Sequence, residues 1–310
     1  MRSSLAAFIL STFFLAGCGS SAPASGKPQI VATIFPLADW AREVAGADAD
    51  VHLLVSGAAN PHHFEPGIRD ATSVTEAKAV FAVGLGLDPW AKTLTQNSGG
   101  GAILFETGTW ITPRKLDALK TIEIGHDDDH DGEHHHEGTA DPHYWLDPQR
   151  ASIVVQRMAE ELGKLDAAHK DGYAQRAAAY IEKLKALNAE LEAGAKTIRP
   201  GTQLVAFHDA YGYLFERLGI KLAAVVQVSP GVEPGLRDVS EAIRIMKEIG
   251  QKTVFKEPAG SASAAKLVAQ ELNASVESLD PMDSEGSDAG TTYLERLRHD
   301  IAVLIKVAKP

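Results

Sequence analysis

Short apolar runs alternate with amphipathic stretches along most of the chain, and this alternation is the first indication of its fold. In the first half, candidate strands rich in apolar and β-branched residues are bounded by Gly, Pro or polar residues, at positions 29–34, 51–55, 79–83 and 102–105. Helical patterns lie between them, for example at 37–44 and 88–96. Strands that alternate with helices predict βαβ units and a mostly parallel sheet.

The same alternation of strand and helix patterns occurs in the last third of the chain. Candidate strands lie at 203–207, 221–228, 253–256 and 274–279, with helical patterns at 210–218, 236–249, 262–272 and 292–307. The sequence therefore predicts two α/β lobes of similar size, each doubly wound around a mostly parallel sheet.

The segment between the two lobes has a purely helical pattern. One helical stretch covers 148–162 and a second covers 166–198, which is dense in Ala, Lys, Glu, Gln and Leu and contains no Pro. Its apolar positions form a helical stripe, at Tyr180, Ile181, Leu184, Leu187 and Leu191. Such a segment is either an ordinary surface helix or a rod of roughly 45 Å. Its length and place favour a long rigid helix that joins the lobes.

The amino terminus has the features of a secretory signal. Arg2 precedes an apolar stretch at 5–15, which at 11 residues is too short to span a bilayer core of about 30 Å. A Ser/Ala/Gly-rich linker follows. The sequence Leu15-Ala16-Gly17-Cys18 resembles a bacterial lipobox, and the resemblance implies cleavage before Cys18 and a lipid on its sulfur. We divide the chain into a signal peptide (1–17), a linker (18–28), an N-terminal lobe (29–150), a helical connector (151–198) and a C-terminal lobe (199–310).

The composition of the chain excludes several kinds of metal site and binding partner. The 310 residues include one Cys, 12 His, 30 Lys and Arg, and 41 Asp and Glu, with a formal net charge of −11. A single Cys excludes an internal disulfide and any zinc site built on several thiolates. The acidic balance argues against nucleic-acid binding.

The histidines are distributed in two ways. Five of them lie within 125–138 beside six acidic residues, and they are His126, His130, His134, His135 and His136. This segment has nothing with which to form a core, so it predicts a loop that collects divalent metal weakly. The alternative is a solvated acidic loop.

Four other positions indicate a formed metal site, namely His62, His143, His208 and Asp280. Three of them lie at or shortly after predicted strand ends, where ligands bind in open α/β sheets. Two come from each lobe, which places the metal in the cleft between the lobes. A satisfied polar residue is the alternative for each histidine alone. The sequence also leaves open whether His63 replaces His62 and whether Glu65 takes part.

The motifs around these positions resemble, in order, those of the zinc-type, ZnuA-like metal-binding lipoproteins of bacterial ABC importers. They are Pro61-His62 with Glu65-Pro66, the segment 141–148, the segment 207–213, and Asp280-Pro281 followed by Gly286-Ser287. The resemblance covers the whole mature chain. It implies two lobes joined by a long helix that close little on metal loading. It also implies a monomeric, lipid-anchored, extracytoplasmic protein that binds zinc at one tight site and works with a permease and an ATPase.

His208 carries the metal preference. Manganese members of the family have a carboxylate where this chain has His208, and three imidazoles with one carboxylate suit zinc. The alternatives are a manganese or other divalent-metal protein of the same type, an adhesin or zinc buffer without a transporter, and an extracytoplasmic zinc hydrolase. We do not expect an enzyme, because four protein ligands close the site and the chain lacks His-Glu-x-x-His and Gly-x-Ser-x-Gly motifs.

Overall fold

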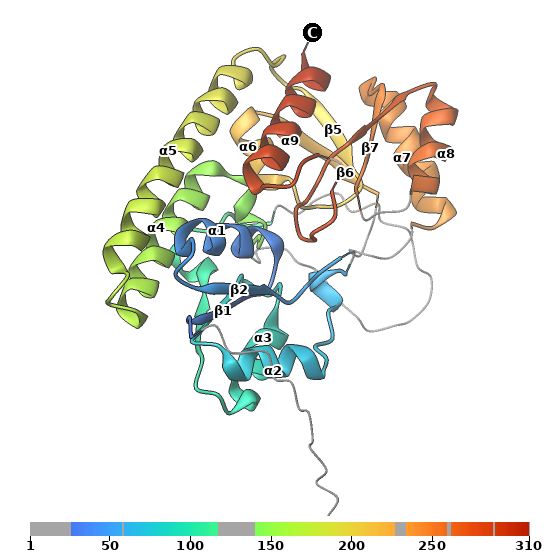
Figure 1. Ribbon diagram of the computed structural model, residues 1–310. Coiled ribbons are helices and arrows are strands. Elements are labelled where there is room, and N and C mark those ends of the chain that lie inside the picture. The colour runs from blue at the N-terminus through green and yellow to red at the C-terminus, as the bar shows by residue number, and fades with distance from the viewer. Residues whose placement is uncertain are drawn as a thin grey trace, which may run out of the picture.

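The N-terminal lobe is built on one continuous sheet in the computed structural model, which describes residues 26–57, 59–116, 140–226, 234–258, 262–287 and 289–309. Its four strands are all parallel and have the order β2-β1-β3-β4. The elements are β1 (Gln29–Ala32), α1 (Phe35–Ala45), β2 (Asp50–Leu53), α2 (Ile68–Glu76), β3 (Ala79–Ala82), α3 (Pro89–Ser98) and β4 (Ile103–Glu106). The predicted parallel α/β lobe is confirmed (Figure 1).

Alternating side chains of this sheet enter two different cores. In β1, Ile30 and Ala32 face the cluster that contains α1, whereas Val31 faces the cluster that contains Val74 of α2. Phe81 and Val80 of β3 divide in the same way. Because successive strand side chains point to opposite faces, helices cover both sides of the sheet, as a doubly wound lobe requires.

The C-terminal lobe has the same element order but not the same sheet. Its elements are β5 (Gln203–Ala206), α6 (Gly212–Leu218), β6 (Lys221–Val225), α7 (Leu236–Ile249), β7 (Thr253–Lys256), α8 (Ala262–Leu272), β8 (Ser275–Ser278) and α9 (Tyr293–Ala308). The strands form two separate parallel pairs, β5-β6 and β7-β8. One side chain bridges the pairs: Gln251 accepts from the Val205 amide at 2.7 Å and donates to the carbonyl oxygens of Val205 and Thr253, at 3.2 and 2.6 Å.

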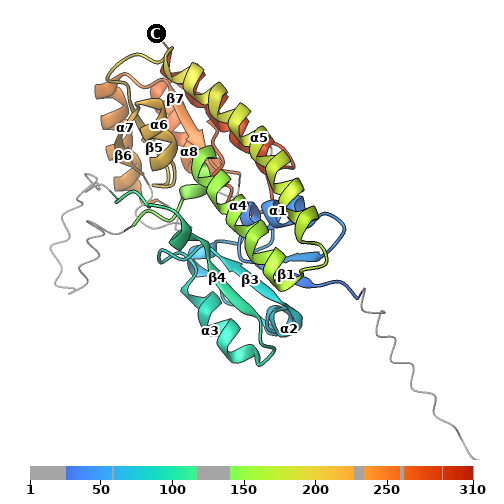
Figure 2. The ribbon, with the colours of Figure 1, turned by 90° about the vertical axis from the view of Figure 1, so that its left-hand side faces the viewer.

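Two long helices lie between the lobes in the sequence, and the second of them runs along both lobes. They are α4 (Pro148–Leu165) and α5 (Lys170–Ala195), and they pack against each other. With 26 residues, α5 is about 39 Å long. It contacts α1 of the N-terminal lobe and both α6 and α9 of the C-terminal lobe, as Figure 2 shows. The predicted stripe residues Tyr180, Leu184, Leu187 and Leu191 are buried on it. The long connecting helix is confirmed.

One apolar core extends through both lobes. It includes Leu37 and Trp40 of α1, Leu184 of α5, and Leu214 and Leu304 of the C-terminal lobe. A shared core resists separation of the lobes, because separation would return apolar surface to water. This packing is consistent with the small closing motion that the family resemblance implies.

Some elements differ from the predicted ones. The helix α2 was not predicted, because Val74 is its one buried side chain and it has no apolar stripe. Short 3₁₀ turns also occur, at η1 (Pro61–His63), η2 (Thr107–Trp110) and η3 (Tyr144–Leu146). No helix among the described residues combines the length and the apolar character needed to cross a bilayer. The signal peptide, Cys18 and the loop 125–138 lie outside the described residues.

Candidate metal centre

Three of the predicted ligands come together between the lobes. His62, His143 and His208 each offer one ring nitrogen, and these nitrogens all lie within 4.8 Å of one another. The ring centroids are 5.8 Å apart for His62–His143 and for His62–His208, and 5.2 Å apart for His143–His208. Among the described residues this is the group of His, Cys, Asp and Glu side chains placed to share a metal ion.

The 3₁₀ turn η1 positions His62. The Asn60 side chain caps this turn by accepting from the His62 amide at 2.9 Å, and Pro61 fixes the backbone at its first position. The indole of Trp90 on α3 donates to the Pro61 carbonyl at 3.2 Å. The imidazole is therefore held by the loop that follows β2, at the edge where ligands bind in parallel sheets.

A charged pair fixes the orientation of His143. One oxygen of Asp141 accepts from both the His143 amide and Nδ1, each at 2.9 Å, and the other oxygen accepts from Arg114 at 2.7 Å. The carboxylate binds the proton on Nδ1, so the lone pair lies on Nε2. Asp141 was not singled out in the sequence, although an acid two residues before a candidate ligand is a usable signal.

His208 lies two residues beyond β5 and is 4% exposed. Its Nδ1 is 3.5 Å from Oε1 of Glu257, which directly follows β7. The hydroxyl of Tyr211 lies 3.3 Å from the same Glu257 oxygen and donates to the Leu279 carbonyl at 3.0 Å. Glu257 therefore acts on His208 as Asp141 acts on His143, by holding the ring from its Nδ1 side.

The imidazoles differ in basicity. Burial, reinforced by the neighbouring imidazoles, lowers the pKa of His62 to about 2. Burial also lowers the pKa of His143, against the opposing effect of Asp141. Burial alone would lower the pKa of His208, but the carboxylates of Glu257 and Asp283 outweigh it, and its pKa is raised. His62 and His143 thus favour the neutral form more than an ordinary histidine does, and His208 retains its proton more readily.

Two ring nitrogens at this site have no hydrogen-bond partner among the described residues. They are Nε2 of His62 and Nε2 of His143, and both are buried. Buried polar atoms are almost always paired in proteins, so an unpaired buried nitrogen calls for an explanation. Neutral imidazole nitrogens that converge within 4.8 Å fit a borderline-soft divalent cation such as zinc.

Asp280 is not in this group. Arg296, which is fully buried, donates to both carboxylate oxygens of Asp280, at 2.6 and 2.9 Å. Ser287 and the Met282 amide also donate to them, at 2.5 and 2.8 Å. The lone pairs that a metal would use are therefore engaged by other donors. The structure gives Asp280 the role of an anchor for the loop after β8, rather than the predicted role of ligand.

The same loop carries another carboxylate beside the histidines. Asp283 interacts electrostatically with His208, and burial, together with Glu257 and Asp280, raises its pKa to about 7. The sequence analysis missed Asp283. The Asp-Pro motif drew attention to Asp280, and the arginine that binds Asp280 lies 16 residues away on α9, where no local pattern indicates it.

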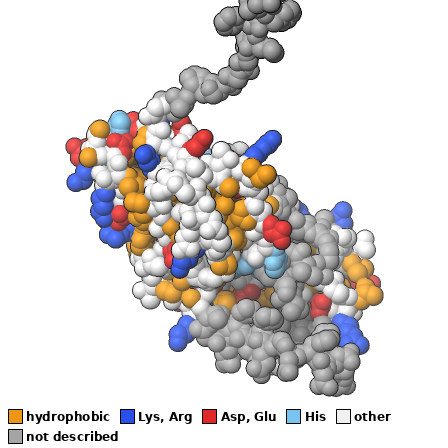
Figure 3. Space-filling model, turned by 90° about the horizontal axis from the view of Figure 1, so that it is seen from below, with side chains coloured by type: hydrophobic (Ala, Val, Ile, Leu, Met, Phe, Trp, Pro, Cys, Tyr) orange, Lys and Arg blue, Asp and Glu red, His pale blue; other side chains and the backbone are white. Residues whose placement is uncertain are grey.

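The other residues considered from the sequence lie apart from the imidazole group. His63 and Glu65 are exposed, so the preference for His62 over His63 agrees with the geometry. Figure 3 shows histidine side chains at the surface seen from below, beside acidic and hydrophobic side chains. The loop histidines His126, His130, His134, His135 and His136, and the lipid-attachment candidate Cys18, lie outside the described residues.

Two curated proteins whose names refer to zinc are similar in sequence to this chain. High-affinity zinc uptake system protein ZnuA of Brucella abortus is 31% identical over 325 aligned positions, covering 95% of this chain and 96% of that protein. Zinc-binding protein AdcA of Streptococcus pyogenes serotype M6 is 27% identical over 293 residues, covering 91% of this chain and 56% of that protein. The chain thus spans little more than half the length of AdcA.

A solved structure extends the similarity to three dimensions. The laminin-binding protein Lmb of Streptococcus agalactiae is described as a bifunctional protein with adhesin and metal-transporting activity. It superposes with a TM-score of 0.76 at 30% identity, covering 91% of this chain and 100% of that chain. Residues 30–307 match the family model described as zinc-uptake complex component A, periplasmic. The chain therefore belongs to the zinc-uptake complex component A family.

Proposed function

We propose that this protein captures zinc outside the cytoplasm and delivers it to the permease of an ABC importer. The observation that carries the proposal is the convergence of His62, His143 and His208, two of which present buried Nε2 atoms without a partner among the described residues. Three imidazoles from separate segments form a nitrogen-rich site that favours zinc over the harder manganese ion.

We further propose that an oxygen donor from the loop after β8 completes the coordination. Asp283 suits this role better than Asp280, because Arg296 engages both oxygens of Asp280 whereas Asp283 interacts with His208. Zinc would replace the proton that Asp283 and His208 hold, so binding releases protons. Four protein donors leave no open position for an activated water, which favours transport over hydrolysis.

The proposed route of zinc has two stages. The loop 125–138, with its five histidines and six acids, raises the local zinc concentration by weak binding. The imidazole site then holds a single ion tightly. Delivery involves a permease and its ATPase, and the protein acts as a monomer held at the membrane by a lipid on Cys18.

Metal analysis of the purified protein tests the central proposal. The full mature chain is loaded with zinc, passed over a desalting column and measured by plasma mass spectrometry. One retained zinc per chain, with manganese retained far less, supports the proposal. Failure to retain zinc, or a preference for manganese, contradicts it.

A matched pair of variants tests the oxygen donor. Asp283→Asn should weaken zinc binding, because the amide oxygen is a poorer ligand than a carboxylate. Glu285→Gln is the control, since it neutralises an exposed acid of the same loop to whose side chain no role is given. Equal zinc affinities for D283N and the unchanged protein would remove Asp283 from the ligand set without affecting the three histidines.

A further inference from the structure

One tryptophan connects the segment of His143 to the loop that carries Asp283. The indole Nε1 of Trp145 donates to the carbonyl oxygen of Pro281 at 2.7 Å. On its other side the indole ring meets the imidazole of His143, with ring centroids 5.2 Å apart and an angle of 63° between the planes. Trp145 therefore contacts one metal-site segment from the first half of the chain and one from the second half.

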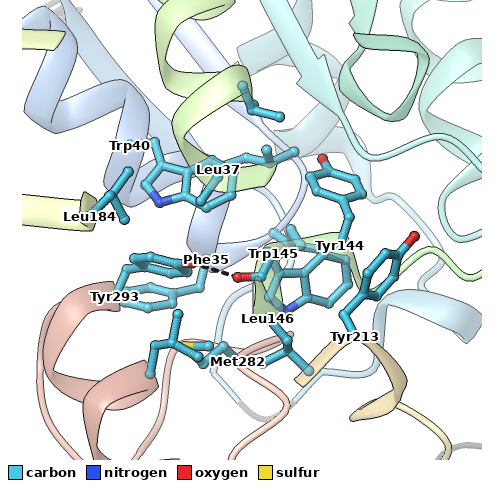
Figure 4. Packing of buried hydrophobic residues seen from close by; sticks show 14 of the residues in the cluster. Phe35, Leu37, Trp40, Tyr144, Trp145, Leu146, Leu184, Tyr213, Met282 and Tyr293 are labelled. Atoms are coloured by element: carbon cyan, nitrogen blue, oxygen red, sulfur yellow. Dashed lines mark hydrogen bonds between the residues drawn. The ribbon is translucent and has the colours of Figure 1, made fainter. Parts of the chain in front are cut away.

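Trp145 is itself held rigidly. It is fully buried, and its backbone carbonyl accepts from the Tyr293 hydroxyl at 2.5 Å. Tyr293 begins α9, and its ring packs edge-on against Trp40 of α1, with centroids 5.0 Å apart. Figure 4 shows Trp145 within this cluster, between Tyr293 and Tyr213. The indole is thus a fixed donor, so the position of the Pro281 carbonyl depends on it.

The loop that Trp145 holds has a strained backbone. Met282 has φ of +58°, in the left-handed region that side chains other than Gly rarely adopt. Its amide donates to Asp280 at 2.8 Å, and its side chain is fully buried. Such a conformation persists only where surrounding contacts over-determine it. Before Met282 these contacts are the Trp145–Pro281 bond and the Arg296–Asp280 pair, and after it Arg296 donates to the Ser284 carbonyl at 2.9 Å.

We infer that Trp145 is a positioning residue that holds the strained loop at 280–283 in its metal-binding conformation and couples that loop to His143 across the cleft. The inference rests on the proposed zinc site but concerns a residue that does not touch the metal. If the loop is already ordered before metal binds, metal binding does not have to offset the entropy lost in ordering the loop. Because of the Trp145–Pro281 bond, the loop stays with the segment of His143 when the lobes move, unless the bond breaks.

The test replaces the indole donor and compares two buried tryptophans. Trp145→Phe removes the N–H and leaves the Pro281 carbonyl unpaired. Trp40→Phe is the matched control, because Trp40 is equally buried in the same core and its Nε1 has no hydrogen-bond partner among the described residues. Both variants lose similar core volume, so the comparison isolates the contacts that Trp145 makes at the cleft, to Pro281 and to His143.

Two measurements on the full mature chain separate positioning from general destabilisation. In W145F, zinc release on chelator challenge should be faster by about tenfold, which is the scale of one buried hydrogen bond. The d–d absorption of bound cobalt should also change, because the oxygen donor is no longer fixed. W40F should match the unchanged protein in both measurements while losing thermal stability.

An unchanged release rate and cobalt spectrum in W145F overturn this inference, and so do equal changes in W145F and W40F. If W145F does not fold, Tyr293→Phe removes only the hydroxyl that holds the Trp145 carbonyl and should shift release in the same direction by a smaller factor. Absence of zinc binding in the unchanged protein would instead contradict the proposed function itself.

Discussion

The two lobes share one plan but differ in how firmly their strands are joined. In both lobes the second helix begins after Gly and has Asp at its third position, which accepts from the Gly amide at 2.7 Å: Asp70 with Gly67 in α2, and Asp238 with Gly235 in α7. In the N-terminal lobe, β1 and β3 are hydrogen-bonded neighbours. Their counterparts β5 and β7 are connected through the side chain of Gln251.

This difference affects the metal site directly. His208 follows β5, whereas Glu257 and the loop with Asp283 follow β7 and β8, so the residues of the C-terminal lobe at the candidate site belong to two separate strand pairs. His62 follows strands of one continuous sheet. A side-chain bridge resists shear less than a ladder of backbone bonds does. We therefore expect adjustment during metal binding and release to occur in the C-terminal lobe.

The histidines that the two lobes contribute to the candidate site also differ in how readily they bind a proton. The pKa of His62 is lowered to about 2 and that of His143 is also lowered, while that of His208 is raised. The N-terminal lobe thus offers neutral nitrogens, and the C-terminal lobe offers one that competes with protons.

The largest expected effect comes from removing the imidazole of the C-terminal lobe. His208→Ala should weaken zinc binding by more than about 100-fold, since replacing a residue that merely orients a ligand already costs 10–100-fold. Competition against a chromophoric chelator measures this affinity. His63→Ala, an exposed neighbour of the site, is the control and should bind as the unchanged protein does. Retained affinity in H208A would mean that the N-terminal lobe binds the metal alone.

The orienting pair of the N-terminal lobe should have the next largest effect. Asp141→Asn removes the charge that faces both His143 Nδ1 and Arg114, and zinc affinity should fall by about tenfold or more. Asp166→Asn provides a control, because Asp166 also binds a histidine, His169 at 2.7 Å, but at the surface. If D166N weakens zinc binding as much as D141N does, the effect is not local.

The bridge between the strand pairs can be broken without touching the site. Gln251→Leu leaves the Val205 amide and carbonyl buried and unpaired, which should lower the free energy of unfolding by about 1–2 kcal/mol. Urea denaturation of the zinc-free protein measures the change. Gln203→Leu at the exposed start of β5 should change stability far less. Equal stabilities for Q251L and Q203L would show that the strand pairs do not depend on the bridge.

The difference in basicity predicts a pH dependence of binding. A raised pKa means that His208 holds its proton up to a higher pH than an ordinary histidine, so zinc affinity should fall as pH decreases through that pKa, by up to about tenfold per unit for one proton. The lowered pKa values of His62 and His143 mean that these residues contribute less to this slope than His208 does. Calorimetry in buffers of different ionisation enthalpy counts the protons released. A slope that persists unchanged in H208A would assign the proton to another group, such as Asp283.

Much of the fold was predictable because the signals were local. The strands β1, β3, β5 and β7 are short apolar runs between polar or Gly residues, and each was located within one or two residues. The helices α7 and α8 were located with their observed bounds. The division of the second sheet was not predictable, since it depends on Gln251, a polar residue outside any strand that pairs with Val205 far away in the sequence.

Most of the candidate metal site was also predictable from the sequence. The rule that ligands gather at the carboxyl ends of parallel strands indicated His62 and His208, the family-like motif at 141–148 indicated His143, and the structure brings these residues together. It failed for Asp280, because a strand-end carboxylate can also serve as the anchor of a buried arginine. Arg296 lies on α9, and only the folded chain brings it to Asp280.

The Nε2 atoms of His62 and His143, which have no hydrogen-bond partner in the described part of the chain, make the stability of the protein depend on bound metal. A buried polar atom without a partner costs about 1–3 kcal/mol, so these atoms lower the free energy of unfolding of the metal-free protein. A ligand bound only by the folded state adds stability, about 2.7 kcal/mol when its free concentration is 100 times its Kd. Local opening around the cleft, and with it cleavage by envelope proteases, would therefore be rarer in loaded molecules than in empty ones. Zinc supply would then set the abundance of the protein as well as its occupancy.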